Sequence, residues 1–336
     1  MVFVDRGIGH NCDLTRYSLR QHALHLANGE DLKHTILLFG ANGQVGHALQ
    51  ASLTCLGKVV ACTRDQIDFN QLPESVAAAL EVLTQRYKPT IVVNATAYTA
   101  VDRAQAEPEI AQRINATAPG FIAKAAHNVG ACMVHFSTDY VFKGDKSEPY
   151  VEADPTDPQS VYGQSKLEGE RAVAIACARH LIFRTSWVVS AHGGNFLKTM
   201  LKLAQERDAL NVVSGQVGAP TSANLIATVT TQILQVLSEQ PGSDPRWGLY
   251  HLVASGHTNW HAYASYVIAQ ARAAGWPIKI QDQAINPIAT KDYPVAAPRP
   301  LNSRLDTYKL CQAFNLTLPE WRVGVDEVLQ ALKSPA

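Results

Sequence analysis

Short apolar runs recur through the first half of the chain. Five of them follow residue 34 in order: TILLFG, KVVACT, TIVVNA, CMVHFS and HLIFRTS. Such runs are typical of strands that are buried on both faces of a sheet. Stretches with helical spacing, such as PESVAAALEVLTQRY and NATAPGFIAKAAHNVG, lie between them. The alternation predicts βαβ units, and therefore an α/β fold with a Rossmann-like, doubly wound parallel sheet.

The alternation becomes less regular after residue 186. Two helical stretches, FLKTMLKLAQER and SANLIATVTTQILQVLSEQ, precede one strand-like run, GLYHLVAS. Four prolines then lie close together, which indicates long loops rather than another sheet: Pro287, Pro294, Pro298 and Pro300. We therefore expect a Rossmann domain over residues 35–186. Residues 187–336 should form mainly a smaller, irregular α/β lobe, with some segments returning to the Rossmann domain.

The composition of the chain excludes several classes of protein. Of its 336 residues, 46% are hydrophobic and 17% are charged, as in an ordinary globular protein. The formal net charge is zero, so no overall field attracts nucleic acid. No apolar run approaches the roughly 18 to 20 residues of a membrane helix, so we expect no membrane partner. The six cysteines are scattered without paired spacing, which favours a reducing cytoplasm.

Residues 1–34 precede the first strand and are predicted to be an extension. They carry charges at Asp5, Arg6 and Asp13 and lack the continuous apolar block of a secretory signal. His22 and His25 stand three positions apart, but no Cys, Asp or Glu pattern completes a metal site around them. We assign no role to this extension and expect no bound metal.

A glycine-rich turn, GANGQVG, follows the first predicted strand and leads into the helical stretch HALQASLTCLG. Glycine at such a turn lets the backbone approach a pyrophosphate, and the start of the helix offers free N–H groups. The turn therefore predicts a dinucleotide site, although glycines also make ordinary tight turns. The residues that we expect to contact the cofactor here are Gly40, Asn42, Gly43, Gln44, Val45 and Gly46.

The second predicted strand ends in CTRDQIDFN, where NAD-binding chains carry an acidic residue for the ribose hydroxyls. Thr63 and Arg64 stand there instead, and a hydroxyl with a guanidinium suits a 2′-phosphate. This favours NADPH, whereas pairing of Asp65 with Arg64 would cancel the preference and leave NADH possible. We expect Asp68 and Phe69 to meet the edge and face of the adenine, unless Asp68 only organises the turn before the next helix.

Candidate catalytic residues follow the fourth predicted strand, which ends in HFSTDYVF. Thr138 lies at this strand end, and Tyr162 and Lys166 lie four residues apart on the next predicted helix, hence on one face of it. The Tyr-Lys spacing alone occurs often by chance. Ligands of doubly wound folds bind outside the carboxyl ends of the strands, however, so we expect the three side chains to converge on the nicotinamide.

These three residue types suit the reduction of a ketone. The substrate oxygen gains charge as hydride is added, and it then needs a proton donor. A free phenol has a pKa of about 10 and gives up its proton slowly, but a neighbouring ammonium stabilises the phenolate and lowers that pKa. We expect Tyr162 to donate the proton, Lys166 to lower the pKa of Tyr162 and contact the nicotinamide ribose, and Thr138 to hold the substrate oxygen.

Seven segments carry a family resemblance, in this order: GANGQVG, NATAYTAVDRAQAEPEIAQRINA, STDYVF, VYGQSKLEGE, LIFRTSWV, QVGAPT and RPLNSRL. From about residue 35 nearly to the C-terminus, the chain resembles the extended short-chain dehydrogenase/reductases and most closely their dTDP-4-dehydrorhamnose reductase family. The resemblance implies NAD(P)-dependent reduction of the C4 ketone of dTDP-4-dehydro-6-deoxy-L-mannose to dTDP-L-rhamnose. It also implies that Tyr162, Lys166 and Thr138 are the catalytic triad.

The resemblance also implies two further groups of site residues. The site for the nucleotide-sugar substrate would be lined by Thr138, Asp139, Tyr140 and Trp187. The residues near the cofactor would be Ala97, Tyr98 and Thr99. Aromatic residues at strand ends often only pack, so Tyr98 and Trp187 could instead be structural.

In one respect the chain departs from the family. Some members hold a metal at a subunit contact through carboxylates just after the glycine turn and in the helix after the GAPT motif. The corresponding stretches here are QVGHAL and TSANLIA, which contain no Asp or Glu. We therefore expect a monomer or a homodimer that this metal does not link.

Other functions of the superfamily are alternatives to reduction. Dehydratases carry Thr-Asp-Glu where this chain has Thr138, Asp139 and Tyr140, and they need that carboxylate to move a proton on the sugar. Epimerases share the Tyr-Lys pair and differ in keeping the oxidised cofactor, so they stay open as an alternative. A regulatory subunit that binds nucleotide without turnover is the second alternative, and the complete triad argues against it.

Overall fold

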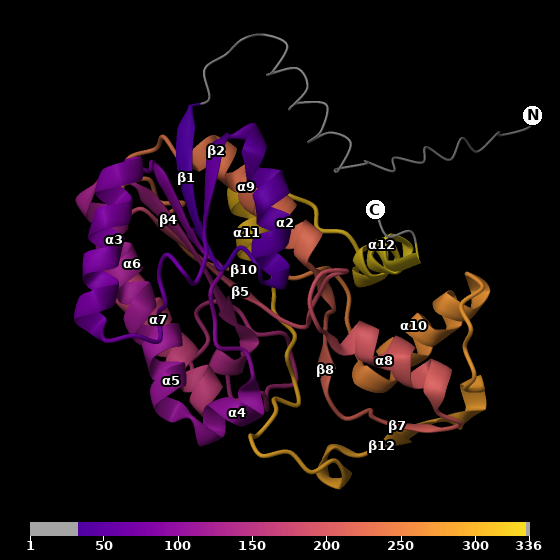
Figure 1. The fold of residues 1–336 in the computed structure, drawn as a ribbon. Helices are drawn as coiled ribbons and strands as arrows, with labels where there is room; N and C mark the ends of the chain where they lie inside the picture. The colour runs from indigo at the N-terminus through magenta and orange to yellow at the C-terminus, as the bar shows by residue number, and fades with distance from the viewer. Residues whose placement is uncertain (1–32, 334–336) are drawn as a thin grey trace, which may run out of the picture.

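Six parallel strands form the central sheet of residues 33–333, the part of the chain that the computed structural model describes (Figure 1). Their order across the sheet is β10-β5-β4-β3-β1-β2. Their bounds are β1 (His34–Phe39), β2 (Gly57–Cys62), β3 (Ile91–Asn94), β4 (Cys132–Thr138), β5 (His180–Thr185) and β10 (Gly248–His251). The predicted α/β fold with a Rossmann-like parallel sheet is confirmed.

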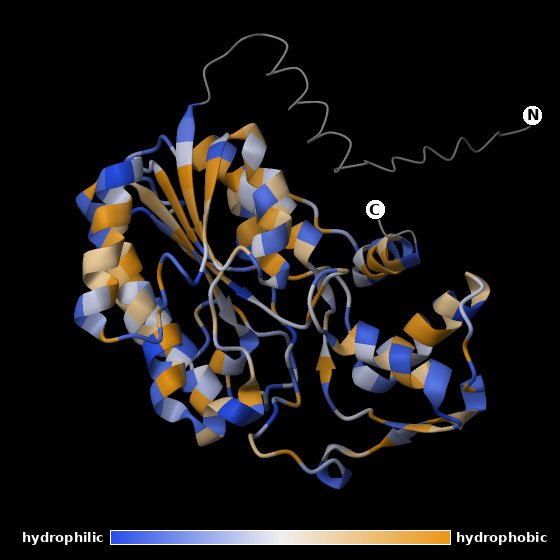
Figure 2. Ribbon diagram, in the orientation of Figure 1, coloured by the Kyte–Doolittle hydropathy of each residue, from blue (hydrophilic) through white to orange (hydrophobic). Residues whose placement is uncertain are grey.

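Helices cover both faces of this sheet (Figure 1). On one face lie α3 (Pro73–Tyr87), α6 (Ala118–Asn128) and α7 (Val161–Ala176), and on the other lie α2 (Gln44–Ser52), α9 (Ala223–Leu237) and α11 (Tyr308–Phe314). Successive strand residues point to opposite faces, so Ile36 and Leu38 belong to one hydrophobic core and Leu37 and Phe39 to the other. Figure 2 accordingly shows mainly hydrophobic strands between helices of mixed hydropathy.

The second half of the chain builds a smaller lobe. Helices α8 (Phe196–Glu206) and α10 (Trp260–Ala273) share a small apolar core with the parallel strand pair β7 (Leu210–Val213) and β12 (Ile285–Ile288). Two shorter pairs are β6 (Val188–Val189) with β9 (Thr221–Ser222) and β8 (Val217–Gly218) with β11 (Thr258–Asn259). The last helix, α12 (Trp321–Lys333), packs against α10.

Parts of this second half pack against the main sheet. β10 pairs with β5 at the edge of the sheet. α9 packs on α2, where the Ser52 Oγ lies 2.8 Å from the Thr231 Oγ1. The domain boundary between residues 186 and 187 stays a prediction. The extension predicted for residues 1–34, with His22 and His25, lies outside the described residues except at its end, where His34 opens β1.

Pro287 corrects the prediction that the proline-rich stretch contains no strand. It lies within β12, opposite Val212 of β7. A central strand donates backbone N–H groups to neighbours on both of its sides, and proline lacks this group. Proline is tolerated in a strand with a single neighbour, at a position that faces no partner. β12 belongs to a two-stranded sheet, so one of its sides needs no such donor.

The helix bounds differ from the sequence-based ones in two places. α2 begins at Gln44, within the glycine motif, and a 3₁₀ turn, η1 (Leu53–Cys55), follows it. The helical stretch predicted at 115–130 is divided between a π-helical turn, η2 (Arg113–Thr117), and α6. The remaining short elements are α4 (Val101–Ala106), α5 (Pro108–Gln112), η3 (Asp139–Val141), η4 (Asp282–Ala284) and η5 (Thr290–Asp292). None of the helices within residues 33–333 has the length and apolarity that a membrane span requires.

Candidate active site

A cavity of about 410 Å³ lies where β1 and β2 end. Seven of its lining residues are cofactor-site residues predicted from the sequence: Gly40, Asn42, Gly43, Thr63, Arg64, Asp68 and Phe69. The others are Ala41, Cys62, Ile67, Thr96 and Ile114. The fold therefore brings the glycine turn and the end of the second strand to one concave surface, as a dinucleotide site requires.

The glycines of the turn are required by close backbone contacts. Gly40 has a φ of +77°, and a Cβ added to it would lie 2.6 Å from the carbonyl carbon of Ala95. A Cβ on Gly46 would lie 2.0 Å from the Gly40 carbonyl oxygen, so this glycine lets α2 pack onto the turn. Gly43 precedes α2 and has no side chain to cap it, while Gln44 and Val45 begin the first helical turn. The start of α2 thus keeps backbone N–H groups for an anion.

Arg64 lies at the rim of this cavity, and 80% of its side chain is exposed. Its Nε is 4.0 Å from the Asp68 Oδ1, so the nearby carboxylate is that of Asp68 rather than of Asp65. The same Asp68 oxygen accepts a hydrogen bond of 3.0 Å from the Asn70 N–H, which means that Asp68 does organise its turn. Because the 4.0 Å pair is exposed and long, it leaves the guanidinium free to bind a phosphate.

The aromatic residues expected near the cofactor are held by protein contacts. Phe69 is buried, and its ring packs edge-on against Phe39 with a centroid distance of 5.5 Å. Tyr98 donates its hydroxyl to Glu107, and its backbone N–H donates to the Asn115 Oδ1 over 2.8 Å. Phe69 therefore offers the cavity only part of its ring, and Tyr98 has a structural role whatever else it does.

Thr96 is the cavity residue that sequence reasoning missed. It follows the end of β3 and lines the cavity, and its Oγ1 is buried without a hydrogen-bond partner among the described residues. The predicted neighbours, Ala97 and Thr99, are absent from the residues that line the cavity. Thr96 lies two residues after Asn94, the last residue of β3, and this position just beyond a strand end is the signal in the sequence that points to it.

The predicted catalytic residues lie at the carboxyl end of β4 and at the start of α7. Thr138 ends this strand, Tyr162 and Lys166 lie in the first two turns of α7, and all three side chains are buried. Tyr162 and Thr138 are linked by a side-chain hydrogen bond. The Ser160 Oγ caps α7 by accepting from the Gly163 N–H over 3.2 Å. Thr138 and Tyr162 therefore lie in contact, whereas the convergence of all three side chains on a nicotinamide stays a prediction.

A glycine between Tyr162 and Lys166 lets α7 approach the end of β4. A Cβ added to Gly163 would lie 2.2 Å from the carbonyl oxygen of Tyr140, in the turn after β4. No side chain fits there, so α7 can lie directly against the strand end that carries Thr138. The ring of Tyr140 in turn packs edge-on against the ring of Tyr162 at 5.4 Å.

The pKa of Tyr162 corrects one expectation. Burial raises it to about 12, and the hydrogen bond with Thr138 only partly offsets this. Lys166 does not lower it, because its ammonium donates to the Phe136 carbonyl over 2.6 Å and lies 3.4 Å from the His135 Nε2. Burial also lowers the pKa of Lys166 to about 8, against the charge of Glu170. The prediction of a lowered phenol pKa was wrong because desolvation exceeds the effect of the amine.

Asp139 places a second acidic group beside the phenol. Its Oδ1 accepts a hydrogen bond of 3.0 Å from the Thr138 Oγ1, and its Oδ2 is buried without a partner among the described residues. Burial raises the pKa of Asp139 to about 6, while bonds from Ser303 and Thr138 act in the opposite direction. The Ser137 Oγ and the Thr185 Oγ1 at neighbouring strand ends are likewise buried and unpaired. Such groups are expected where a polar ligand binds.

Trp187 follows β5 with a φ of +47°, which is rare for a bulky residue. Its ring stacks on that of Trp260 with a centroid distance of 3.6 Å. A Cβ added to Gly218 would lie 2.6 Å from the Trp187 ring, so the glycine makes room for it. These contacts account for a packing role, and a contact of Trp187 with the sugar stays a prediction.

Comparison with known proteins gives the family. Residues 34–334 match the family model described as the RmlD substrate binding domain. The chain belongs to this family. It is 49% identical over 300 residues to the dTDP-4-dehydrorhamnose reductase of Escherichia coli K12, covering 88% of this chain and 97% of that one. It is 47% identical over 297 residues to the Salmonella typhimurium reductase, covering 88% and 96%.

Solved structures agree with this membership in the dTDP-4-dehydrorhamnose reductase family. The Clostridium acetobutylicum reductase has a TM-score of 0.80 and 34% identity, covering 89% of this chain and all of that one. The Bacillus anthracis reductase, solved in complex with NADP, has a TM-score of 0.80 and 30% identity, covering 89% and 99%.

The residues of this family member fit a nicotinamide dinucleotide. The glycine turn leaves no room for a Cβ at Gly40 or Gly46, and Thr96, whose buried Oγ1 has no hydrogen-bond partner among the described residues, lines the same cavity. Arg64 at the rim is free to meet a phosphate. NAD(P)H is therefore the cofactor, as the sequence predicted, and these residues would hold it.

Proposed function

We propose that the protein reduces the C4 ketone of dTDP-4-dehydro-6-deoxy-L-mannose, also called dTDP-4-dehydro-β-L-rhamnose, to dTDP-L-rhamnose. The observation that carries this proposal is the buried contact between Thr138 at the end of β4 and Tyr162 at the start of α7, with Lys166 one turn later, in a fold that also forms a dinucleotide cavity. Membership in the dTDP-4-dehydrorhamnose reductase family supplies the identity of the sugar and of the base. Activated rhamnose of this kind is a precursor for polysaccharide synthesis.

Tyr162 is proposed as the proton donor. A reduced nicotinamide supplies the hydride when it is bound, and the C4 oxygen of the sugar then takes the phenolic proton. The raised pKa of Tyr162 keeps the phenol protonated throughout the neutral range, so the donor is loaded before each reaction. Transfer becomes favourable only as negative charge builds up on the substrate oxygen.

Lys166 and Thr138 are proposed to support that transfer. The Thr138 hydroxyl lies between Asp139 and Tyr162, where it can hold the C4 oxygen in line with the phenol. The Lys166 ammonium can donate to the nicotinamide ribose. Both roles depend on the burial of the site, since charges act more strongly on each other where water is excluded.

NADPH is the cofactor that we propose the enzyme prefers, with NADH as the weaker alternative. Thr63 and Arg64 would bind the 2′-phosphate, and the glycine turn would bind the pyrophosphate. Asp68 and Phe69 remain the proposed adenine contacts. Ala97, Tyr98 and Thr99 are proposed only as neighbours of the site, since the cavity is lined by Thr96 instead.

Asp139, Tyr140 and Trp187 are the proposed substrate contacts besides Thr138. The unpaired Asp139 Oδ2 offers an acceptor to a sugar hydroxyl. The 6-methyl of the deoxysugar presents an apolar patch that the Trp187 ring can cover. We further propose a cytoplasmic enzyme that acts as a monomer or as a homodimer, without the metal link of some relatives.

Product analysis tests the function. The protein is incubated with the 4-keto sugar nucleotide and NADPH, cofactor oxidation is followed by absorbance, and the product is identified by NMR. We expect stoichiometric oxidation of NADPH and the configuration of rhamnose at C4. The C4 epimer as product, or tightly bound oxidised cofactor without net consumption of NADPH, would assign the chain to an epimerase. Binding without turnover would indicate a regulatory subunit.

A further inference from the structure

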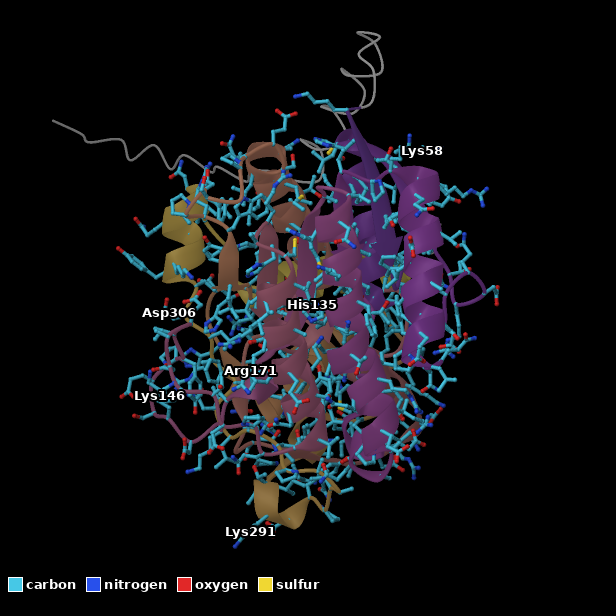
Figure 3. All side chains as sticks on the ribbon, turned by 90° about the vertical axis from the view of Figure 1, so that its left-hand side faces the viewer. Lys58, His135, Lys146, Arg171, Lys291 and Asp306 are labelled. Atoms are coloured by element: carbon cyan, nitrogen blue, oxygen red, sulfur yellow. The ribbon has the colours of Figure 1, made fainter. Side chains whose placement is uncertain are left out.

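His135 lies next to the proposed catalytic lysine in the middle of the molecule. It belongs to β4, and Figure 3 labels it near the middle of the view, whereas Lys58, Lys146 and Lys291 are labelled toward the periphery. It has no exposed surface. Its Nδ1 is 3.2 Å from the Asn94 Nδ2, and its Nε2 is 3.4 Å from the Lys166 Nζ. The imidazole therefore bridges β3 and α7 through both of its ring nitrogens.

The direction of the hydrogen bonds in this bridge is set at Asn94. The backbone N–H of Thr96 can only donate, and it does so to the Asn94 Oδ1 over 3.0 Å. The amide NH₂ of Asn94 must then face His135, and an NH₂ group can only donate as well. The Nδ1 of His135 is consequently the acceptor and carries no proton.

The proton of the neutral ring must therefore be on Nε2. Burial and the charge of Lys166 lower the pKa of His135 well below its usual value, which keeps the ring neutral. A neutral imidazole carries one N–H, and with Nδ1 as acceptor this N–H points at the Lys166 Nζ. A neutral amine can accept that hydrogen, whereas an ammonium has only donors and cannot.

We propose that Asn94 and His135 act as a positioning pair, which directs a ring N–H at Lys166 and so weakens the hold of this lysine on its proton. The pair touches neither the substrate nor the cofactor and acts through Lys166. Lys166 keeps the Phe136 carbonyl as the acceptor for its own N–H, so its position is fixed in either protonation state.

The other charged or titratable groups around Lys166 do not replace this effect. Glu170, one turn later on α7, favours the ammonium, and it is already bound to Arg184 of β5 through two hydrogen bonds of 2.8 and 2.7 Å. Tyr162, one turn earlier, is a neutral phenol. His135 from β4 is thus the neighbour that opposes protonation of Lys166.

The proposal rests on the proposed reduction for its catalytic meaning, but its first test needs no substrate. The full chain is labelled with ¹⁵N-histidine, and the tautomer of His135 is read from its ring nitrogen shifts, assigned by loss of the signal in His135→Phe. We expect a neutral ring with the proton on Nε2 between about pH 6 and 9. An Nδ1–H tautomer or a charged ring in this range would overturn the proposal, whatever the enzyme reduces.

Asn94→Asp provides the second test. The carboxylate still accepts from the Thr96 N–H but now also accepts from the Nδ1 of His135, so the tautomer reverses and Nε2 becomes an acceptor for the ammonium. In the pH profile of kcat, the fall at high pH should follow the deprotonation of Lys166. The pKa of Lys166 is about 8, whereas that of Tyr162 is about 12, so Lys166 loses its proton first. We expect this fall to move up by about one pH unit, a tenfold gain in proton affinity.

A double variant separates the tautomer from the added charge. In the His135→Phe background, Asn94→Asp brings the same carboxylate but has no ring proton to redirect. The shift of the fall at high pH should then be much smaller than in the presence of His135. An equal shift in both backgrounds, or no shift with His135 present, would overturn the proposal. If Asn94→Asp fails to fold, the tautomer of the unaltered protein still decides.

Discussion

Glu170 and Lys166 lie one turn apart on α7, and each belongs to a buried site that contains a cation. The two cations, Arg184 and Lys166, have different hydrogen-bond partners. At the first, Arg184 is bound by both carboxylate oxygens of Glu170, each side chain is 5% exposed, and the guanidinium lies 4.9 Å from the centroid of the Phe142 ring. At the second, Lys166 is 1% exposed, but its hydrogen-bond partners in the described chain are a carbonyl and the neutral His135.

The difference separates a group that holds the fold from a group that can react. A buried charge bonded to its counter-charge is part of the packed interior, and breaking such a pair costs stability. A buried amine without a bonded carboxylate loses part of its proton affinity and titrates near neutral pH, as catalytic groups do.

The largest effect is expected at the reactive site. Tyr162→Phe removes only the hydroxyl from a ring that still packs against Tyr140, so cofactor affinity should change little. General acid catalysis contributes about 10²- to 10⁴-fold, so turnover of the 4-keto sugar should fall at least by that factor. Steady-state kinetics and cofactor titration measure the two quantities. A variant that keeps more than half of the wild-type turnover would remove Tyr162 from the chemistry.

A change at the Glu170–Arg184 pair should lower the stability of the protein. Glu170→Gln keeps the shape of the side chain but leaves Arg184 buried without its counter-charge, which should cost about 3–5 kcal/mol of unfolding free energy. Urea unfolding measures this loss. The double variant Glu170→Leu with Arg184→Met removes both charges and should recover most of it. If the single variant is as stable as wild type, the pair is not what holds α7 to β5.

Lys166 should show its low proton affinity in the pH dependence of stability. Its pKa is about 8 in the folded chain and about 10.4 in the unfolded chain. Between these values the unfolded state binds more protons, so this group makes the free energy of unfolding rise with pH. Relative to Lys166→Met, wild type should therefore gain on the order of 3 kcal/mol across the window. Urea unfolding curves that run parallel for the two proteins would contradict the lowered pKa.

Arg64 is an exposed cation and should give the smallest effect. Arg64→Ala should raise the Michaelis constant for NADPH about tenfold, as the loss of a charge-assisted hydrogen bond does, and should leave that for NADH nearly unchanged. Arg86→Ala removes another arginine that lies on α3, away from the cavity, and serves as the matched control. Equal changes for both cofactors would show that Arg64 does not read the 2′-phosphate.

Much of this architecture could be predicted because it depends on local patterns. Strands buried on both faces leave continuous apolar runs, and the Tyr162 and Lys166 spacing places both on one helix face. The glycines at 40 and 46 are visible as a motif, and the structure supplies the backbone contacts that require them.

The remainder depends on contacts between distant parts of the chain. The Trp187 ring stacks on Trp260, and no local sequence pattern predicts a stacking partner so far along the chain. The direction of the Tyr162 pKa was mispredicted for the same reason. It depends on the depth of burial and on Lys166 turning toward His135, a residue of another strand that the sequence marks only as part of an apolar run.

The return of β10 to the central sheet has a consequence for synthesis on the ribosome. β5 ends at Thr185, but its outer neighbour, β10, begins only at Gly248, and α9, which covers one face of the sheet beside α2, ends at Leu237. Until those segments emerge, the nascent chain exposes an unpaired edge of β5 and an uncovered apolar face, both of which favour aggregation. We therefore expect the cofactor-binding half to complete its folding late in translation and to depend on chaperones more than its position in the chain would suggest.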